Sequence, residues 1–416
     1  MGSTLPPSLA ISKKSPVSGL ILLPQTNGGN SITTDTTNGN CINMQLPAPG
    51  KFYGARLIFK NYSTTVPMII DSVKVAPVAI RAGGSVTVQQ NQYLTFGSQA
   101  TFNGSTSVTI PVATAGAGAQ VIPSFVITDL IIVDAIARTD YPAEPYLLRV
   151  ATHLAASNAA STYHFNYSGT YVAAFDTLAA NPGLRIATQN FSGASATAAA
   201  MTGAAYSVSE QGGCMNPVGA IFYTDNESIN MVTVGDSLVA GHGSLSEYAG
   251  WPEYLMMQNY NTSTNQCAYS VENHAESGQL SIDSMATLKA VLAAYPIKPK
   301  LAVFKAYSPN DGTTQANADK AWALCLDAIQ YCNNYNVQPV VLTSWAAAGT
   351  NWSVITTQNN RVLNLPSSVI TIDVGNYVSP GGTINSGWNI AANDGVHLND
   401  AGYAAVAAYI KKYLPT

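Results

Sequence analysis

Short runs of hydrophobic and polar residues, several of them alternating, mark the first half of the chain. Such runs lie at residues 55–59, 72–75, 85–88, 107–110 and 125–128, between clusters of Gly, Asn, Ser and Pro. A period of two is typical of strands that bury one face. Strands at this spacing predict an all-β sandwich or jelly-roll domain over residues 1–220. The small residues at 192–205 predict a loop or linker within it.

The second half of the chain changes to apolar runs that alternate with helical segments. The runs at residues 231–234, 301–304, 339–342 and 369–372 predict buried strands. The clearest helix is predicted at 316–335, where apolar side chains recur every three to four residues. Strand–helix alternation predicts a parallel sheet with helices on both faces, over residues 221–416. Ligands of such sheets bind beyond the carboxyl ends of the strands.

Composition narrows the classes of function. Charged residues make up 10% of the 416 residues, the net charge is −4, and no run of Lys or Arg occurs. Since an average soluble domain has about 25% charged residues, the surface must consist largely of Asn, Thr, Ser and Gln. These features argue against a nucleic-acid partner. They favour a protein that is extracellular or exposed on a virion or cell surface.

No membrane span, signal peptide or structural metal site is expected. The longest apolar stretch, residues 121–133, is interrupted by polar residues and Pro, and it is much shorter than the roughly 20 residues of a spanning helix. The N-terminus lacks a basic segment followed by an apolar one. The five cysteines have no C-x-x-C spacing, which argues against zinc. We expect most of them to be buried as small hydrophobic residues.

A first candidate for chemistry is Gly235-Asp236-Ser237-Leu238, directly after the predicted strand that ends at Val234. A Ser at a strand-to-helix turn is exposed at the edge of the sheet. Its own N–H points to where negative charge develops on an attacked carbonyl, so Ser237 can supply both a nucleophile and an oxyanion donor. Alone, this tetrapeptide is a weak signal, because Gly, Asp and Ser are common in turns.

A second candidate is the pair Asp394 and His397, just before the predicted terminal helix. A Ser nucleophile needs a neutral imidazole to accept its proton, and that imidazole needs a carboxylate to fix its tautomer. An Asp three residues before a His on a loop can fold back to the imidazole Nδ1. In isolation, a turn Asp and a surface His explain the same pattern.

Together the two motifs resemble the GDSL or SGNH hydrolase family over residues 230–416. The family's second block, Asn-x-x-x-Ser-Gly, matches residues 273–278 and places Gly278 as an oxyanion-hole N–H donor. Its third block, Gly-x-Asn-Asp, matches residues 308–311 and places Asn310 as a side-chain donor. Ser308 replaces the family's Gly, and Pro309 restricts the backbone beside it.

The resemblance implies a flavodoxin-like three-layer α/β fold and a serine esterase. Ser237 is expected as the nucleophile, His397 with Asp394 as the acid/base pair, and Ser237, Gly278 and Asn310 as the oxyanion hole. The mechanism needs no metal or organic cofactor. Trp388, His242 and His274 are weaker candidates for substrate contact, and structural roles explain them as well.

A β-sandwich before an SGNH domain resembles an arrangement in carbohydrate esterases that remove O-acetyl groups, including phage tail deacetylases. The resemblance therefore favours an acetylated polysaccharide as substrate. A short-chain or lipid esterase remains open, although no long apolar lid is evident. A glycan-binding structural protein of a particle, with an inactive SGNH domain, is the alternative outside enzymes. The sequence gives no indication of oligomeric state.

Overall fold

The computed structural model describes residues 18–21, 31–33, 37, 39–78, 98–118, 121–136, 146–156, 162–164, 187–191, 217–224, 228–244, 250–261, 263, 266–390 and 394–416. The predicted strand at 85–88 and the predicted loop at 192–205 lie outside these residues. Among the described helices, none has the length and apolar character needed to cross a membrane.

The second half of the chain forms a parallel sheet of five strands. They are β16 (Ile229–Thr233), β19 (Tyr269–Asn273), β20 (Leu301–Lys305), β21 (Gln338–Leu342) and β22 (Ile370–Ile372). Their spatial order is β19-β16-β20-β21-β22, and each neighbouring pair is parallel. In chain order this is 2-1-3-4-5, the flavodoxin-like arrangement. The predicted α/β sheet is therefore present, and its strand order reverses between β16 and β20.

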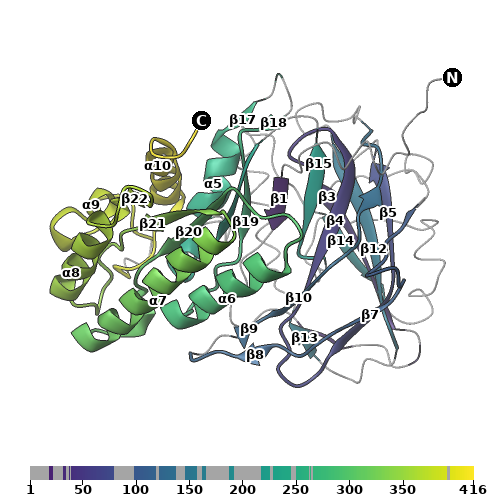
Figure 1. Ribbon diagram of the computed structural model, residues 1–416, viewed down its shortest axis with the longest axis horizontal. Coiled ribbons are helices and arrows are strands. Elements are labelled where there is room, and N and C mark those ends of the chain that lie inside the picture. Colours follow the sequence, from purple (N-terminus) through teal and green to yellow (C-terminus); the bar gives the residue numbers. More distant parts are fainter. Residues whose placement is uncertain are drawn as a thin grey trace.

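Helices cover both faces of this sheet because its strands are apolar on both sides (Figure 1). Met231 belongs to a core cluster shared with α5 and α10, whereas its neighbour Val232 belongs to the cluster of α6 and α7. Successive strand side chains point to opposite faces, so both clusters continue along the sheet.

The α-helices are α4 (Ser237–Ala240), α5 (Trp251–Gln258), α6 (Ser281–Ala294), α7 (Gln315–Asn334), α8 (Trp352–Leu363), α9 (Val374–Val378) and α10 (Asp400–Lys411). Two short 3-10 helices are η3 (Pro309–Asp311) and η4 (Pro380–Gly382).

The first half of the chain is β-rich, and part of it extends the same sheet. Strands β10 (Ser124–Ile127), β4 (Phe52–Asn61), β15 (Gly219–Thr224) and β1 (Ser18–Ile21) continue it in the order β10-β4-β15-β1-β19. Strand β1 pairs antiparallel with β15 and parallel with β19. The sheet therefore crosses the predicted boundary at residue 220, and the division into residues 1–220 and 221–416 stays a prediction.

A second, antiparallel sheet packs against this extension. Its strands are β14 (Ala187–Phe191), β3 (Asn40–Pro47), β12 (Leu147–Leu154), β5 (Met68–Val78) and β6 (Ser98–Gln99), with β7 (Val108–Ile110) beside β5. Apolar residues of both sheets share one core cluster, with Phe52 and Phe222 from the extended sheet and Val73 and Val150 from the antiparallel one. The first half therefore packs as two layers, one of which belongs to the sheet that continues into the second half.

Short strands complete the described elements: β2 (Ser31–Thr33), β8 (Thr114–Ala115), β9 (Val121–Ile122), β11 (Ile131–Ile132), β13 (Thr162–His164), β17 (Tyr260–Asn261) and β18 (Gln266–Cys267). The four cysteines in the described ranges, Cys41, Cys267, Cys325 and Cys332, are free and buried. Cys214 lies outside the described residues.

Candidate active site

Ser237 begins α4 immediately after strand β16. Asp236 caps this helix, and its Oδ1 accepts a hydrogen bond of 3.0 Å from the Leu238 N–H. A side chain at Gly235 would place its Cβ 2.6 Å from Val239, so the turn requires glycine there. Gly241 ends α4 in the left-handed region, with φ of 85°. These contacts fix a tight strand–turn–helix that holds Ser237 at the carboxyl end of β16, where the residue is only 6% exposed.

The loop before α10 brings His397 to this serine. His397 Nε2 lies 2.8 Å from Ser237 Oγ, and His397 Nδ1 lies 2.6 Å from Asp394 Oδ2. The other oxygen of Asp394 accepts the N–H groups of Val396 and His397 at 2.8 and 2.9 Å. The structure therefore joins three residues, two of them 160 positions apart, in the hydrogen-bonded chain that nucleophilic acyl transfer requires.

Electrostatics favour the charged form of Asp394. Partial burial raises its pKa, but the hydrogen bonds from the His397 N–H, the His397 ring and the Val396 N–H outweigh burial, and the pKa lies below its usual value. Asp394 therefore remains a carboxylate at neutral pH. It can accept the Nδ1 proton of His397 and leave Nε2 free to accept the serine proton.

Contacts from the loop after β21 hold the histidine loop in place. The Trp345 indole N–H donates to the Val396 carbonyl at 3.2 Å, and the Ala348 N–H donates to the Gly395 carbonyl at 2.8 Å. Gly395 has φ of 69°, and a Cβ there would lie 3.0 Å from Ala348. The position of His397 therefore depends on two elements, its own loop and the loop that contains Trp345.

The second sequence block follows β19 and contacts the nucleophile turn. Asn273 accepts from Thr233 Oγ1 at 2.9 Å and donates to Glu253 Oε1 at 2.8 Å. Further along, Gly278 has φ of 82°, a region that favours glycine. Within the described residues, neither the Ser237 N–H nor the Gly278 N–H has a hydrogen-bond acceptor. Both groups are thus available to an oxygen of a bound ester.

The third block forms η3 beside this turn. Ser308 caps it, since its hydroxyl accepts from the Asn310 N–H and Asp311 accepts in return from the Ser308 N–H. The Asn310 side chain is exposed and donates one hydrogen to the Gln279 carbonyl at 3.1 Å. Its amide keeps a second hydrogen, which is what an oxyanion donor needs.

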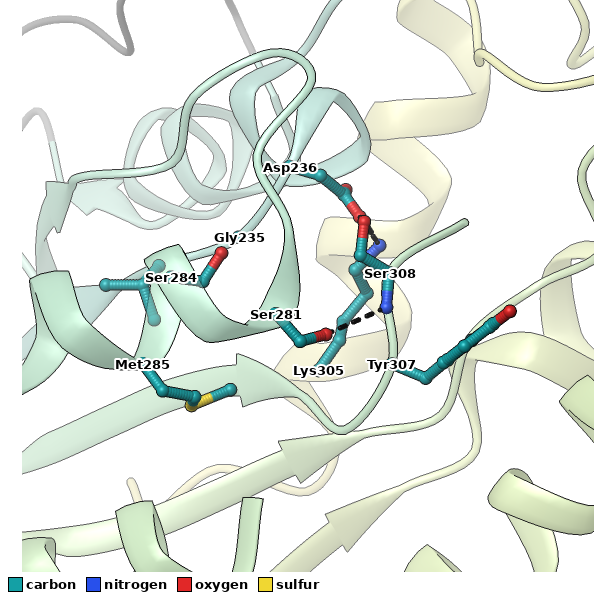
Figure 2. Close-up of a pocket in the computed structure, with 9 residues that line it drawn as sticks. Gly235, Asp236, Ser281, Ser284, Met285, Lys305, Tyr307 and Ser308 are labelled. Atoms are coloured by element: carbon teal, nitrogen blue, oxygen red, sulfur yellow. Dashed lines mark hydrogen bonds and ion pairs between the residues drawn. The ribbon is translucent and has the colours of Figure 1, made fainter. Parts of the chain in front are cut away.

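Ser308 and Lys305 join the nucleophile turn in a way that sequence reasoning missed (Figure 2). The Ser308 hydroxyl lies 2.6 Å from Asp236 Oδ2, and Lys305 Nζ lies 2.8 and 2.7 Å from the two Asp236 oxygens. The side chains of Lys305 and Asp236 are only 3% and 0% exposed. A lysine directly after a fully apolar strand run was the available signal.

The three weaker candidates are placed differently from one another. The His242 ring lies against the His397 ring, with centroids 4.5 Å apart, so His242 borders the site. His274 instead lies in the core, 1% exposed, with Nε2 3.1 Å from the Tyr295 hydroxyl. His274 is therefore not placed to contact substrate. Trp388 is partly buried, and its ring packs 5.3 Å from that of Tyr377.

A second group of buried charges links Lys60 of β4 electrostatically with Glu272 of β19 and with Glu276, although β15 and β1 lie between the two strands in the sheet. Lys60 of β4 is fully buried against the rings of Tyr62 and Phe125. Burial lowers the pKa of Lys60 to about 8, and burial raises the pKa of Glu276 to about 8 although the charge of Lys60 lowers it. Neither carboxyl oxygen of Glu276 has a hydrogen-bond partner within the described residues. This Lys60 cluster, which includes Glu272, connects the first-half strands to the second sequence block.

No group of three or more potential metal ligands occurs within the described ranges. No protein-family model matches the chain, and no curated protein matches it.

Several solved structures resemble part of the chain. One is a putative acylhydrolase from Bacteroides fragilis, with 16% identity and a TM-score of 0.33, covering 44% of this chain and 85% of that one. Another is a putative lipolytic protein of the G-D-S-L family from Desulfitobacterium hafniense, with 14% identity and a TM-score of 0.37, covering 45% and 100%. A third is the lipase/acylhydrolase from Enterococcus faecalis, with 19% identity and a TM-score of 0.34, covering 44% and 93%. The second of these is described as belonging to the family that the four sequence blocks resemble.

Proposed function

We propose that the chain is a serine ester hydrolase of the GDSL/SGNH type. The observation that supports this most strongly is the continuous chain from Ser237 Oγ to His397 Nε2 at 2.8 Å and from His397 Nδ1 to Asp394 Oδ2 at 2.6 Å. A buried serine hydroxyl, an imidazole and a carboxylate in this order form the arrangement that activates an alcohol for acyl transfer.

The reaction proceeds through an acyl-enzyme. Ser237 Oγ attacks the ester carbonyl carbon while His397 Nε2 accepts the serine proton. The tetrahedral intermediate carries its negative charge on the former carbonyl oxygen, which accepts from the N–H groups of Ser237 and Gly278 and from the Asn310 amide. Collapse of the intermediate breaks the bond to the leaving alcohol, which takes the proton from His397. Water, deprotonated by His397, then releases the acid and restores Ser237.

The favoured substrate is an O-acetylated polysaccharide. The supporting features are the low content of charged residues, at 10% of the chain, and the β-rich first half in front of the hydrolase region. A surface with few charges suits contact with neutral glycans. An extracellular location, or exposure on a virion or cell surface, is proposed with it. A short-chain or lipid esterase is the second candidate, and a glycan-binding particle protein without activity is the third.

A panel of three substrates separates these candidates. Hydrolysis of p-nitrophenyl acetate, p-nitrophenyl palmitate and an acetylated polysaccharide is measured for the wild type and for Ser237→Ala. We expect activity on both acetyl substrates, little on the palmitate, and loss of activity in Ser237→Ala. Preference for palmitate would reject the deacetylase. No hydrolysis of any of the three esters would reject the hydrolase function and favour the glycan-binding protein.

A further inference from the structure

Lys305, the last residue of β20, contacts the nucleophile turn through Asp236. Its Nζ lies 2.8 and 2.7 Å from the two oxygens of Asp236, the residue that caps α4 directly before Ser237. Figure 2 shows the Lys305 side chain directed at this carboxylate, beside the Ser308 hydroxyl that contacts the same oxygen, Oδ2. Asp236 Oδ1 also accepts the Leu238 N–H. The Lys305 ammonium therefore anchors the group that shapes the turn around Ser237.

The same ammonium contacts the residue that holds the histidine loop. Lys305 Nζ lies 5.5 Å from the centre of the Trp345 ring, within the range of a cation–π contact. Trp345 is 1% exposed, and its indole N–H donates to the Val396 carbonyl, one residue before His397. A single buried side chain thus touches the supports of both the nucleophile and the base.

We infer that Lys305 is a positioning residue that keeps Ser237 Oγ and His397 Nε2 at hydrogen-bonding distance. This inference rests on the proposed hydrolase function. The two residues come from segments 160 positions apart, and each segment has its own local supports. Their 2.8 Å separation depends on the relative placement of the two segments, and Lys305 is in contact with Asp236 on one and Trp345 beside the other. A misplacement of about 1 Å between reacting groups can reduce a rate roughly a hundredfold.

Lys305→Met removes the ammonium and keeps most of the apolar stem. We expect kcat on p-nitrophenyl acetate to fall at least tenfold with KM changed by no more than about twofold, because the Lys305 side chain is only 3% exposed and bonded to Asp236. A residue with only a structural role would lower the melting temperature and leave kcat per folded molecule unchanged. The fraction of folded protein is therefore measured beside the kinetics.

The matched control is Lys289→Met. Lys289 also forms an ion pair, with Asp327, and lies over an aromatic ring, that of Tyr331, but its side chain is 31% exposed on α6. The same substitution there should leave kcat, KM and the fold unchanged.

Removing Lys305 alone leaves the Asp236 carboxylate buried without its cation, and that variant can fail to fold. The double variant Asp236→Asn with Lys305→Met removes both charges and keeps an oxygen that can accept the Leu238 N–H. We expect it to fold and to retain the tenfold or larger loss of kcat. A folded double variant with wild-type kcat would overturn the inference.

Trp345→Phe tests the other contact without burying a charge. It keeps an aromatic ring for Lys305 but loses the N–H that holds Val396, and we expect a threefold to tenfold fall in kcat at constant KM. Unchanged kcat in this variant would contradict the proposed link to the histidine loop. A wild type inactive on every ester would reject the proposed function, whereas an active wild type with unaffected Lys305 variants would reject only the inference.

Discussion

Two buried lysines in this molecule lie beside carboxylates and differ in how those carboxylates are hydrogen-bonded. Lys305 contacts both oxygens of Asp236, and those oxygens also accept from Leu238 and Ser308. In the Lys60 cluster, the carboxyl oxygens of Glu276 have no hydrogen-bond partner within the described residues, and burial raises the pKa of this group to about 8. The two buried carboxyl groups therefore differ in the number of direct hydrogen bonds that they accept. Such bonds replace the contacts with water that a group loses on burial.

The difference matches the position of each cluster. The ion pair of Lys305 and Asp236 is part of the nucleophile turn, where the position of Ser237 must be fixed. The Lys60 cluster links β4 to β19, the strand that leads to the second block, across the positions of β15 and β1 in the sheet. Three predictions test the comparison.

The largest effect is expected for Lys305→Met on stability. It leaves a fully buried carboxylate without its cation, and breaking a buried pair in this way costs about 3–5 kcal/mol. Urea unfolding at pH 7 measures this free energy. Asp236→Asn combined with Lys305→Met should recover most of the loss. If the single variant loses less than about 1 kcal/mol, the pair is not the tightly held one described above.

Glu276→Gln should change how stability depends on pH. The raised pKa means that the folded state holds a proton between pH 4.5 and about 8 that the unfolded state releases. The contribution of the Glu276 carboxyl to the free energy of unfolding is fully present below pH 4.5. It is lost as the pH rises towards 8, at about 1.4 kcal/mol per pH unit. Gln cannot ionise, so the variant should lose less stability than the wild type between pH 5 and 8, by about 2 kcal/mol or more. Parallel pH profiles for the two proteins would show that Glu276 is not held in its neutral form.

Ser308→Ala is expected to have the smallest effect of the three. It removes the hydroxyl that donates to Asp236 and caps η3, and a hydrogen bond to a charged group contributes about 1.5–3 kcal/mol. We expect the free energy of unfolding to fall by about 2 kcal/mol, again by urea unfolding at pH 7. A variant as stable as the wild type would mean that Lys305 and the Leu238 N–H hold Asp236 without the Ser308 hydroxyl.

Apolar runs in the sequence predicted individual strands of the parallel sheet, because each run lies within one short segment of the chain. The apolar runs at 231–234, 301–304, 339–342 and 369–372 correspond to β16, β20, β21 and β22. The extension of this sheet by β4, β15 and β1 was not predicted, because alternation shows that a strand has a buried face but not which edge it joins.

In the candidate site too, the sequence predicted residues that lie in short motifs but not the contacts between distant segments. Ser237, Asp394 and His397 lie in short motifs, so the sequence could place them together. His274 was misplaced because neighbouring strand-end residues point to opposite faces. Asn273 therefore reaches Glu253 of α5, while His274 turns towards Tyr295 at the end of α6. Lys305 was missed because its carboxylate partner lies 69 residues earlier in the chain.

In the proposed hydrolase reaction, Ser237 is the residue that becomes acylated. A fluorophosphonate reacts much faster with an activated serine than with an ordinary hydroxyl, and mass spectrometry of the digested protein identifies the modified residue. We expect one adduct, on Ser237 of the wild type, no adduct in Ser237→Ala, and slow labelling in His397→Ala. An adduct on a different residue, or wild-type ester hydrolysis by Ser237→Ala, would contradict it.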